Sequence, residues 1–342
     1  MKPGALRLLV MHVSTRCDQT CGHCSIWKQS SLAGKSLTVG ERLALIAEAR
    51  ALGATSVLFT GGEPLLCDHI EELSRHAHRI GLNVQIATNG LGLARHATWI
   101  GAVVSEVYVS LEGPRAIHDS VRGASMFDRL QASLAPLLSS QTRPRVIGRS
   151  VLSSRNASFA EHTVAAAREI GLDGLSFLPA DTTSGAFGGE PGLRTSLELS
   201  NEDVIALRAG ILALHKRREL GGFVLETGSK LTSMADGFAR SPSNAVAPRC
   251  DAPEWSSVIE ADGSIRPCFF QPVVLGAPAL RLGEARRSPE YAAALSRLGP
   301  SNPICKRCVC PKYRGGASVS DRVTNAIGRR WAALRQPGEN AA

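Results

Sequence analysis

Residues 17–24 read Cys17-Asp-Gln-Thr-Cys21-Gly-His-Cys24, and they follow an apolar, β-rich run at residues 7–13. Such a run predicts a buried strand, so the three cysteines fall on the loop that leaves its carboxyl end. One short loop can surround a cluster at these spacings, and thiolates are the ligands that iron–sulfur clusters select. Three thiolates leave one iron of a four-iron cluster open, as catalytic zinc sites keep one open position. A zinc knuckle is the alternative reading of the spacing.

Strands and helices alternate outward from this loop to about residue 180. The predicted strands are 7–13, 55–60, 83–88, 106–111, 145–152 and 174–178. The predicted helices are 38–52, 68–80, 91–100, 127–138 and 158–170, and Gly53, Gly81 and Gly171 close three of them. This order predicts an α/β fold with a parallel sheet, either a barrel or a doubly wound sheet, and both bind ligands at the carboxyl ends of the strands.

The second half of the chain has a different composition. Residues 181–199 predict a loop, 202–220 a helix capped by Ser200 or Asn201, and 229–248 an irregular, turn-rich segment. Five of the nine cysteines lie beyond residue 249. We therefore expect a barrel at 1–200, a helical linker at 201–248, a cysteine-rich module at 249–320 and a tail at 321–342.

Composition excludes several classes of protein. The 342 residues are 44% hydrophobic and 20% charged, which is typical of a globular protein rather than a disordered one. A net charge of +9 favours an anionic substrate, an acidic peptide or nucleic acid, but 5% aromatic residues and no dense basic block disfavour a dedicated nucleic-acid binder. No run predicts a membrane helix or an export signal, so we expect a cytoplasmic protein with reduced cysteines.

Short motifs follow the next three predicted strands. They are Thr60-Gly61-Gly62-Glu63-Pro64, Thr88-Asn89-Gly90 and Ser110-Leu111-Glu112-Gly113. With the three-cysteine run, they resemble the motifs of the radical S-adenosylmethionine (SAM) enzymes. The phrase His118-Asp119-Ser120-Val121-Arg122-Gly123 resembles one common in the peptide-modifying branch, where many members have Asp in place of Glu112.

The resemblance implies a partial (β/α)6 TIM-like barrel. It implies a [4Fe–4S] cluster on Cys17, Cys21 and Cys24, with His23 beside the adenine of SAM. The positions that match the SAM-binding motifs of this family are Gly61, Gly62, Glu63, Thr88, Asn89, Ser110 and Glu112.

A second set of cysteines consists of Cys250, Cys268, Cys305, Cys308 and Cys310. Ala261-Asp262-Gly263 predicts a hairpin between residues 256–260 and 264–268. The thiol count alone fits zinc as well as an iron–sulfur cluster.

The spacing Cys-x12-Gly-x4-Cys resembles the auxiliary-cluster module called SPASM, or its shortened form, twitch. Arg314 and Ser318 stand where a full SPASM module has cysteines. The resemblance therefore implies one auxiliary [4Fe–4S] cluster on Cys250, Cys268, Cys305 and Cys308, with Cys310 as an alternative ligand. Cys67 has no partner at metal spacing and is predicted to be a buried structural thiol.

In this superfamily the reduced cluster splits SAM into methionine and a 5′-deoxyadenosyl radical, which removes a hydrogen atom from the substrate. The resemblance implies a radical SAM oxidoreductase or maturase acting on a peptide side chain or a polar small molecule, with flavodoxin or ferredoxin as electron donor. Phe269 stands where sulfatase-maturing relatives have a basic carboxylate.

Alternatives are an aminocyclitol or sugar dehydrogenase, a cyclase like the GTP 3′,8-cyclase, and a non-catalytic iron–sulfur or zinc sensor. Candidate substrate contacts, by position only, are Asp181, Arg149, Glu254 and Arg314.

Overall fold

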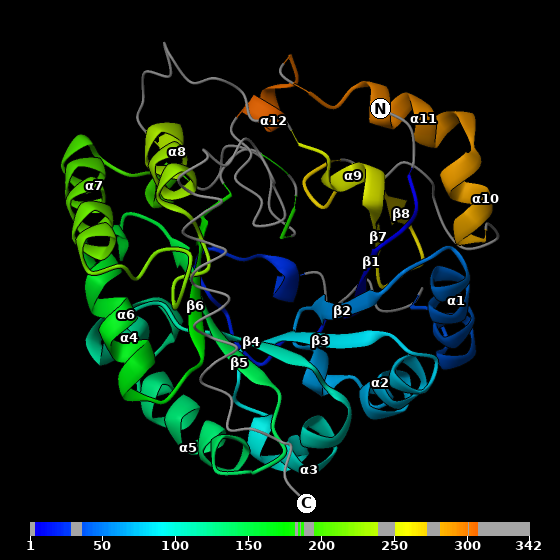
Figure 1. Cartoon of the computed structure of the whole chain (residues 1–342), viewed down its shortest axis with the longest axis horizontal. Helices are drawn as coiled ribbons and strands as arrows, with labels where there is room; N and C mark the ends of the chain where they lie inside the picture. Colours follow the sequence, from blue (N-terminus) through cyan, green and yellow to red (C-terminus); the bar gives the residue numbers. More distant parts are fainter. Residues whose placement is uncertain are drawn as a thin grey trace, which may run out of the picture.

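The computed structural model describes residues 4–28, 36–181, 184, 186–187, 195–238, 250–271, 281–299 and 301–306. Its strands form one curved sheet in the order β6-β5-β4-β3-β2-β1-β7-β8 (Figure 1). All neighbours are parallel except β7 and β8. Their bounds are β1 Leu8–Ser14, β2 Ser56–Gly61, β3 Asn83–Thr88, β4 Glu106–Ser110, β5 Arg145–Leu152, β6 Gly174–Pro179, β7 Ser256–Ile259 and β8 Ile265–Arg266.

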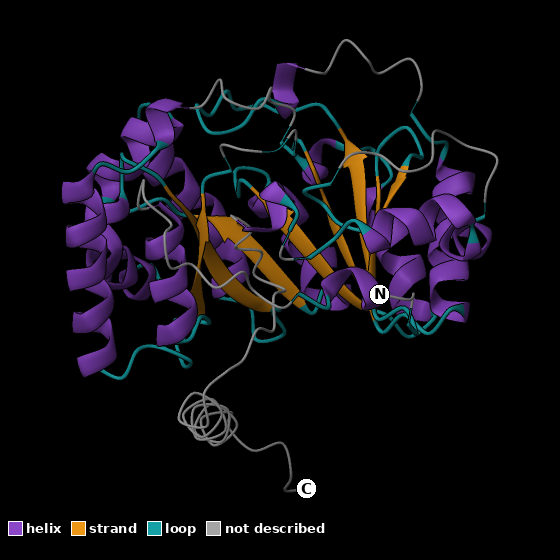
Figure 2. Cartoon of the chain, turned by 90° about the horizontal axis from the view of Figure 1, so that it is seen from above, coloured by secondary structure: helices purple, strands orange, loops and turns teal. Residues whose placement is uncertain are grey.

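Helices cover the outer face of this sheet (Figures 1 and 2). The longer ones are α1 Val39–Ala51, α2 Ile70–Arg79, α3 Leu93–Val103, α4 Arg115–Arg122, α5 Met126–Leu138, α6 Ala160–Glu169, α7 Asn201–Lys216, α8 Gly228–Phe238 and α11 Pro289–Ser296. The short ones are η2 Pro64–Leu66, η3 Ala157–Phe159, η4 Thr195–Leu197, α9 Ala252–Trp255, α10 Leu282–Arg287 and α12 Pro303–Lys306. In the described residues the strand order ends at β6 and β8, so the barrel is partial.

Side chains of the strands alternate between two apolar layers. Leu9 and Met11 of β1 belong to the large core between sheet and helices. Leu8 belongs to a smaller cluster with Leu58, Tyr108 and Ile147, against which Val10 packs. Because side chains alternate along a strand, His12 continues the inner row at the carboxyl end of β1.

The predicted α/β class and the six parallel strands are confirmed. Strands 83–88 and 145–152 have the predicted bounds, and the other four differ by one residue at one or both ends. Ser200 forms a capping box with Asp203 at the start of α7. Gly53, Gly81 and Gly171 have positive φ at the ends of their helices, as a glycine C-terminus predicts.

The prediction of an irregular segment at 229–248 is wrong for its first part, where α8 lies. Leu231, Met234 and Ala235 are buried at helical spacing, and the Lys230 N–H donates to Thr227 Oγ1 at 3.3 Å. Gly228 and Gly237, near the two ends of α8, resemble turn signals in the sequence. The helix forms in spite of them because it packs against α7.

The hairpin at 256–268 forms, although it pairs over fewer residues than predicted. Its first strand, β7, lies parallel to β1 with Val10 opposite Val258, so the hairpin extends the barrel sheet. The predicted ligands Cys308 and Cys310, and the positions Arg314 and Ser318, lie outside the described residues. Within the described part of the chain, none of the helices combines the length and apolar character that crossing a membrane requires.

Candidate functional site

The loop that carries Cys17, Cys21 and Cys24 is held against the end of β2. The Gly62 N–H donates to Ser14 O at 2.7 Å, and the Glu63 N–H donates to Arg16 O at 2.8 Å. A Cβ on Gly62 would lie 2.2 Å from Arg16 O, and one on Gly61, where φ is +131°, would lie 2.3 Å from Ser14 O. The cysteine loop therefore approaches both positions too closely for any residue other than glycine. The atoms that a Cβ would meet there belong to the backbone of this loop.

Glu63 connects the ends of β2 and β3. Its Oε1 accepts from Thr88 Oγ1 at 2.7 Å and from the Leu65 N–H at 3.0 Å, while Oε2 accepts from the Asn89 N–H at 2.7 Å. The side chain is 1% exposed. Burial raises the pKa of Glu63 to about 7, although the three donors favour the ionised form.

Asn89 joins this group to the cysteine loop, since its Nδ2 donates to Asp18 Oδ1 at 2.6 Å. Ser110 at the end of β4 donates to Thr88 O at 3.4 Å. The structure thus brings Glu63, Thr88, Asn89 and Ser110 together beside the cysteine loop, at the carboxyl ends of the strands.

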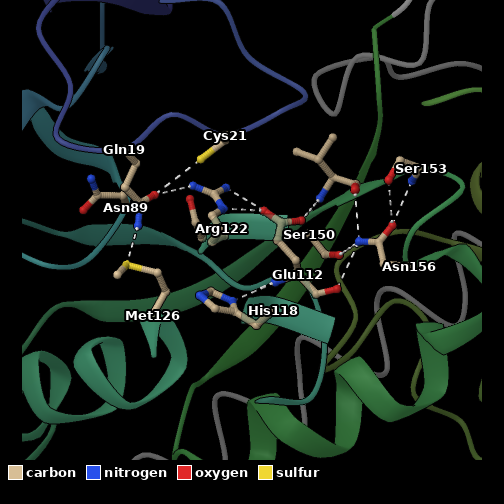
Figure 3. A network of polar contacts seen from close by, with 12 residues as sticks. Gln19, Cys21, Asn89, Glu112, His118, Arg122, Met126, Ser150, Ser153 and Asn156 are labelled. Carbon is tan, nitrogen blue, oxygen red and sulfur yellow. Dashed lines mark hydrogen bonds and ion pairs between the residues drawn. The ribbon is translucent and has the colours of Figure 1, made fainter. Parts of the chain in front are cut away.

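Glu112 and Arg122 form a buried ion pair next to this group (Figure 3). Arg122 Nε and Nη2 donate to Glu112 Oε1 at 3.0 and 2.5 Å, and Glu112 Oε2 accepts from the Val151 N–H at 2.8 Å. The Glu112 side chain is fully buried. Despite this burial, the Arg122 charge holds the pKa of Glu112 below its ordinary value. Both carboxylate oxygens of Glu112, which matches a SAM-binding position of the family, are therefore bound by the protein itself.

Two further side chains surround Glu112. His118 Nδ1 accepts from the Glu112 N–H at 3.3 Å, and burial lowers the pKa of His118 to about 4. Asn156 donates to Glu112 O at 3.0 Å and to Val151 O at 3.1 Å (Figure 3). His118 belongs to a recognisable sequence motif, whereas the only local signal of Asn156 is its position just after β5.

The three thiols fit an iron–sulfur cluster. None of the three is in a disulfide, and Cys17 and Cys21 influence each other electrostatically, as do Cys21 and Cys24. Burial raises the pKa of the Cys17 thiol to about 11 and also raises that of Cys21, so a bound cation must displace the protons. In the described residues no three His, Cys, Asp or Glu side chains converge on a single metal position. A cluster does not require such convergence, because each thiolate binds a different iron.

The second cysteine set is partly described. Gln271 lies between two of its members, since its N–H donates to Cys268 O at 3.2 Å and its Nε2 lies 3.8 Å from Cys305 Sγ. Cys250 lies two residues before the start of α9, with Asp251 between them as the N-cap. As predicted, Cys67 is buried, and its side chain belongs to the apolar core.

A polar group that the sequence analysis missed lies on the inner side of β1. His12 Nδ1 is 2.8 Å from Glu260 Oε2, and Arg266 Nε is 2.8 Å from Glu260 Oε1. His12 is 7% exposed, and its Nε2 is buried with no hydrogen-bond partner. Its ring lies 5.3 Å from that of Phe269, next to Cys268. Only the pairing of β7 with β1 brings these residues together, so no local signal revealed them.

The candidate substrate contacts lie in different settings. Arg149 on β5 stacks on the Tyr108 ring with its guanidinium 3.9 Å from the ring centre, inside the barrel. Asp181 accepts from the N–H and hydroxyl of Ser184. Glu254 lies on α9, where its carbonyl accepts from Gly4 and Arg286.

Comparison with known proteins agrees with this arrangement. Residues 11–135 match the family model described as the radical SAM superfamily. This segment is therefore similar to radical SAM domains. It spans β1 to α5, and therefore includes the cysteine loop and the motifs at the ends of β2, β3 and β4.

Two relatives of this chain carry the name AdoMet-dependent heme synthase. The one from Methanosarcina barkeri is 26% identical over 322 residues, which cover 91% of this chain and 89% of the relative. The one from Oleidesulfovibrio alaskensis is 33% identical over 122 residues, which cover 35% of this chain and 31% of the relative.

Solved structures share the fold. SuiB of Streptococcus suis superposes with a TM-score of 0.66 at 17% identity, over 93% of this chain and 74% of that chain. The protein anSMEcpe with bound AdoMet superposes with a TM-score of 0.64 at 18% identity, over 96% of this chain and 97% of that chain. Both superpositions extend well beyond the segment that the family model matches, to the C-terminal part of the fold.

Proposed function

We propose that this chain is a catalytic radical SAM enzyme that uses Cys17, Cys21 and Cys24 to hold a [4Fe–4S] cluster. The observation that carries the proposal is the three-thiol loop, which hydrogen bonds attach to the ends of β2 and β3 within the segment that is similar to radical SAM domains. The bound cluster would supply the electron that splits SAM into methionine and a 5′-deoxyadenosyl radical, the species that removes hydrogen from the substrate.

The protein's own residues would bind and orient SAM at the strand ends. The backbone that faces the cysteine loop at the end of β2 consists of Gly61, Gly62 and Glu63. The ends of β3 and β4 carry Thr88, Asn89 and Ser110. We place SAM against this row. Glu112 belongs to our proposed set by its place just after β4, where Arg122 and the Val151 N–H hold its carboxylate.

We propose that the substrate enters the barrel interior, where His12 and Arg149 present polar nitrogens. His12 Nε2 and Arg149 Nε are both buried without a hydrogen-bond partner, and a ligand hydroxyl, which can donate to Nε2 and accept from Nε, would satisfy either. A peptide side chain or a polar small molecule is the first candidate. Structures of SuiB with the precursor peptide SuiA and of anSMEcpe with the Cp18Cys peptide support the peptide class.

The second candidate is an iron tetrapyrrole or a related heme precursor. The end-to-end similarity to an AdoMet-dependent heme synthase favours it. So does the aromatic group near His12, in which the Phe187 and Phe270 rings lie 4.8 and 5.3 Å from that of Phe269 and offer faces for a planar ligand.

We further propose a twitch-like auxiliary [4Fe–4S] cluster on Cys250, Cys268, Cys305 and Cys308, with a flavodoxin or ferredoxin as electron donor. The contact of Gln271 with both Cys268 and Cys305 supports this ligand set. An oxidoreductase or maturase reaction would use such a cluster as an electron acceptor.

The compound Fe-coproporphyrin III can distinguish the two substrate classes, and it appears in the name of another relative, the Fe-coproporphyrin III synthase of Methanosarcina barkeri. The anaerobically reconstituted and reduced chain is incubated with SAM, with and without this compound, and 5′-deoxyadenosine is quantified. Faster formation with the compound supports the tetrapyrrole class. An unchanged rate contradicts that class and leaves the peptide or polar-molecule class. No 5′-deoxyadenosine under either condition contradicts the enzyme as a whole and favours a non-catalytic iron–sulfur module.

A further inference from the structure

The ion pair of Glu112 and Arg122 is more deeply buried than any other in the described part of the chain, and the proposed function gives Arg122 no role. The exposed fraction is 9% for the Arg122 side chain and 0% for Glu112. Removing two charges from water is costly unless their geometry is good and their other groups are bonded. Here Arg122 donates through Nε, Nη1 and Nη2, and Glu112 accepts at both oxygens. A buried pair with this many hydrogen bonds has a fixed geometry, so it can fix the position of a side chain that is hydrogen-bonded to it.

The cysteine loop is attached to this pair through Gln19. Arg122 Nη1 donates to Gln19 Oε1 at 3.1 Å, and Cys21 Sγ lies 3.5 Å from the same oxygen (Figure 3). Gln19 is 5% exposed. The guanidinium and the thiol therefore meet at one buried amide oxygen. The guanidinium contacts Glu112 through Nε and Nη2 and Gln19 through Nη1, so the positive charge lies between the carboxylate and this shared oxygen. Arg122 also interacts electrostatically with Cys24.

We propose that Arg122 is a positioning residue that holds the Cys21 side of the loop and supplies a positive charge favouring the reduced [4Fe–4S] cluster, with Glu112 as the counter-charge that limits this effect. The proposal depends on the proposed function, because the cluster is part of it. Reduction adds one electron to the cluster, so a nearby buried cation stabilises the reduced state and a nearby anion destabilises it.

This arrangement predicts shifts of opposite sign. Glu112→Gln leaves the guanidinium without its counter-charge and raises the midpoint potential of the cluster. The double variant Glu112→Gln/Arg122→Gln leaves no buried charge unpaired, and it lowers the potential because the positive end that faces the thiolates is lost. Arg122→Lys keeps the charge but not the forked geometry, and it falls between the wild type and the double variant.

The chain offers a matched control at the other end of β5. Arg143 Nη1 and Nη2 donate to Asp173 at 2.6 and 2.9 Å, and Asp173 accepts from the Val146 N–H at 2.8 Å. Glu112 accepts from Val151 in the same way, near the carboxyl end of the strand. The variant Arg143→Gln/Asp173→Asn therefore removes a similar pair far from the cysteine loop and should leave the potential unchanged.

The test is an anaerobic redox titration of the reconstituted full chain, followed by electron paramagnetic resonance. The signal that changes when SAM is added identifies the cluster on the cysteine loop. Opposite shifts for Glu112→Gln and the double variant support the proposal. No shift in either, or equal shifts in both, overturns it. If the wild type forms no such cluster, the proposed function fails as well, whereas a cluster that forms, cleaves SAM and keeps its potential in every variant overturns this inference alone.

The positioning role has its own readout in the chain without iron. Amide hydrogen exchange in residues 17–24 should be faster in the double variant than in the wild type, and unchanged in the Arg143/Asp173 variant. Exchange in this loop that is the same in all three chains overturns the positioning role.

Discussion

At the scale of single residues, buried carboxylates and histidines at the strand ends organise the site. Glu63 accepts three hydrogen bonds, and Glu112 is bound by Arg122 and Val151. The motifs therefore have a structural role that does not depend on a ligand. Glycines 61 and 62 likewise allow two stretches of backbone to approach closely.

The buried His118 side chain should make the folded protein less stable in acid. Burial lowers its pKa to about 4, whereas the unfolded chain titrates near 6.5. Below pH 6.5 the unfolded state therefore binds a proton that the folded state does not bind until about pH 4. The free energy of unfolding should fall by about 2 kcal/mol from this group between pH 7 and pH 5.

Urea unfolding of the iron-free chain at the two pH values measures this contribution. His118→Gln should show a smaller decrease than the wild type, and His69→Gln, which removes an exposed histidine at the N-cap of α2, should behave as the wild type does. An equal decrease in wild type and His118→Gln would contradict the assignment.

At the scale of elements, apolar sequence patterns and the glycines at helix ends predicted most of the strands of the sheet. Strands 83–88 and 145–152 were predicted with the observed bounds because their apolar patterns and flanking turns are local. Helix α4 was not predicted, although it places His118 and Arg122 on one face at i, i+4 spacing. It has eight residues and no side-chain cap, so its local signal is weak.

Long-range pairing could not be predicted from local pattern. The pairing of β7 with β1 joins segments about 250 residues apart and creates the group of His12, Glu260 and Phe269. Similarly, the motif at Glu112 was predicted as a site, but its pairing with Arg122 depends on the turn before α4.

A substitution at Gly62 tests whether the end of β2 positions the cysteine loop. Gly62→Ala places a methyl group 2.2 Å from Arg16 O, which forces the backbone ahead of Cys17 to move. SAM affinity should fall about tenfold, equivalent to 1.4 kcal/mol, and iron incorporation should fall with it. Gly22→Ala is the control, because a Cβ there meets nothing within 4 Å although the residue lies in the same loop. Equal SAM dissociation constants for both variants and the wild type would show that β2 does not position the loop.

At the scale of the whole molecule, the partial barrel positions Cys17, Cys21 and Cys24 after β1. Of the described members of the second set, Cys250 precedes β7 and Cys268 follows β8. Since β7 pairs with β1, the two sets are connected through neighbouring strands. The barrel interior between them contains His12 and Arg149, where we place the substrate.

The number of clusters follows from the cysteines. Four irons on each of two sets predict about eight irons and eight sulfides per chain after anaerobic reconstitution. A variant with Cys17, Cys21 and Cys24 replaced by Ala should retain about half of that iron. About twelve irons in the wild type would mean a third cluster. Four irons with one zinc would make the second set structural and would remove the proposed electron acceptor.

The central claim is that the three-thiol loop makes this chain cleave SAM. The most direct measurement is 5′-deoxyadenosine formation by the reconstituted chain, reduced anaerobically with dithionite, compared with the Cys17→Ala/Cys21→Ala/Cys24→Ala variant. The account predicts 5′-deoxyadenosine and methionine in equal amounts from the wild type and none from the variant. Absence of 5′-deoxyadenosine from a wild-type chain that holds its cluster, or equal amounts from both chains, would contradict it.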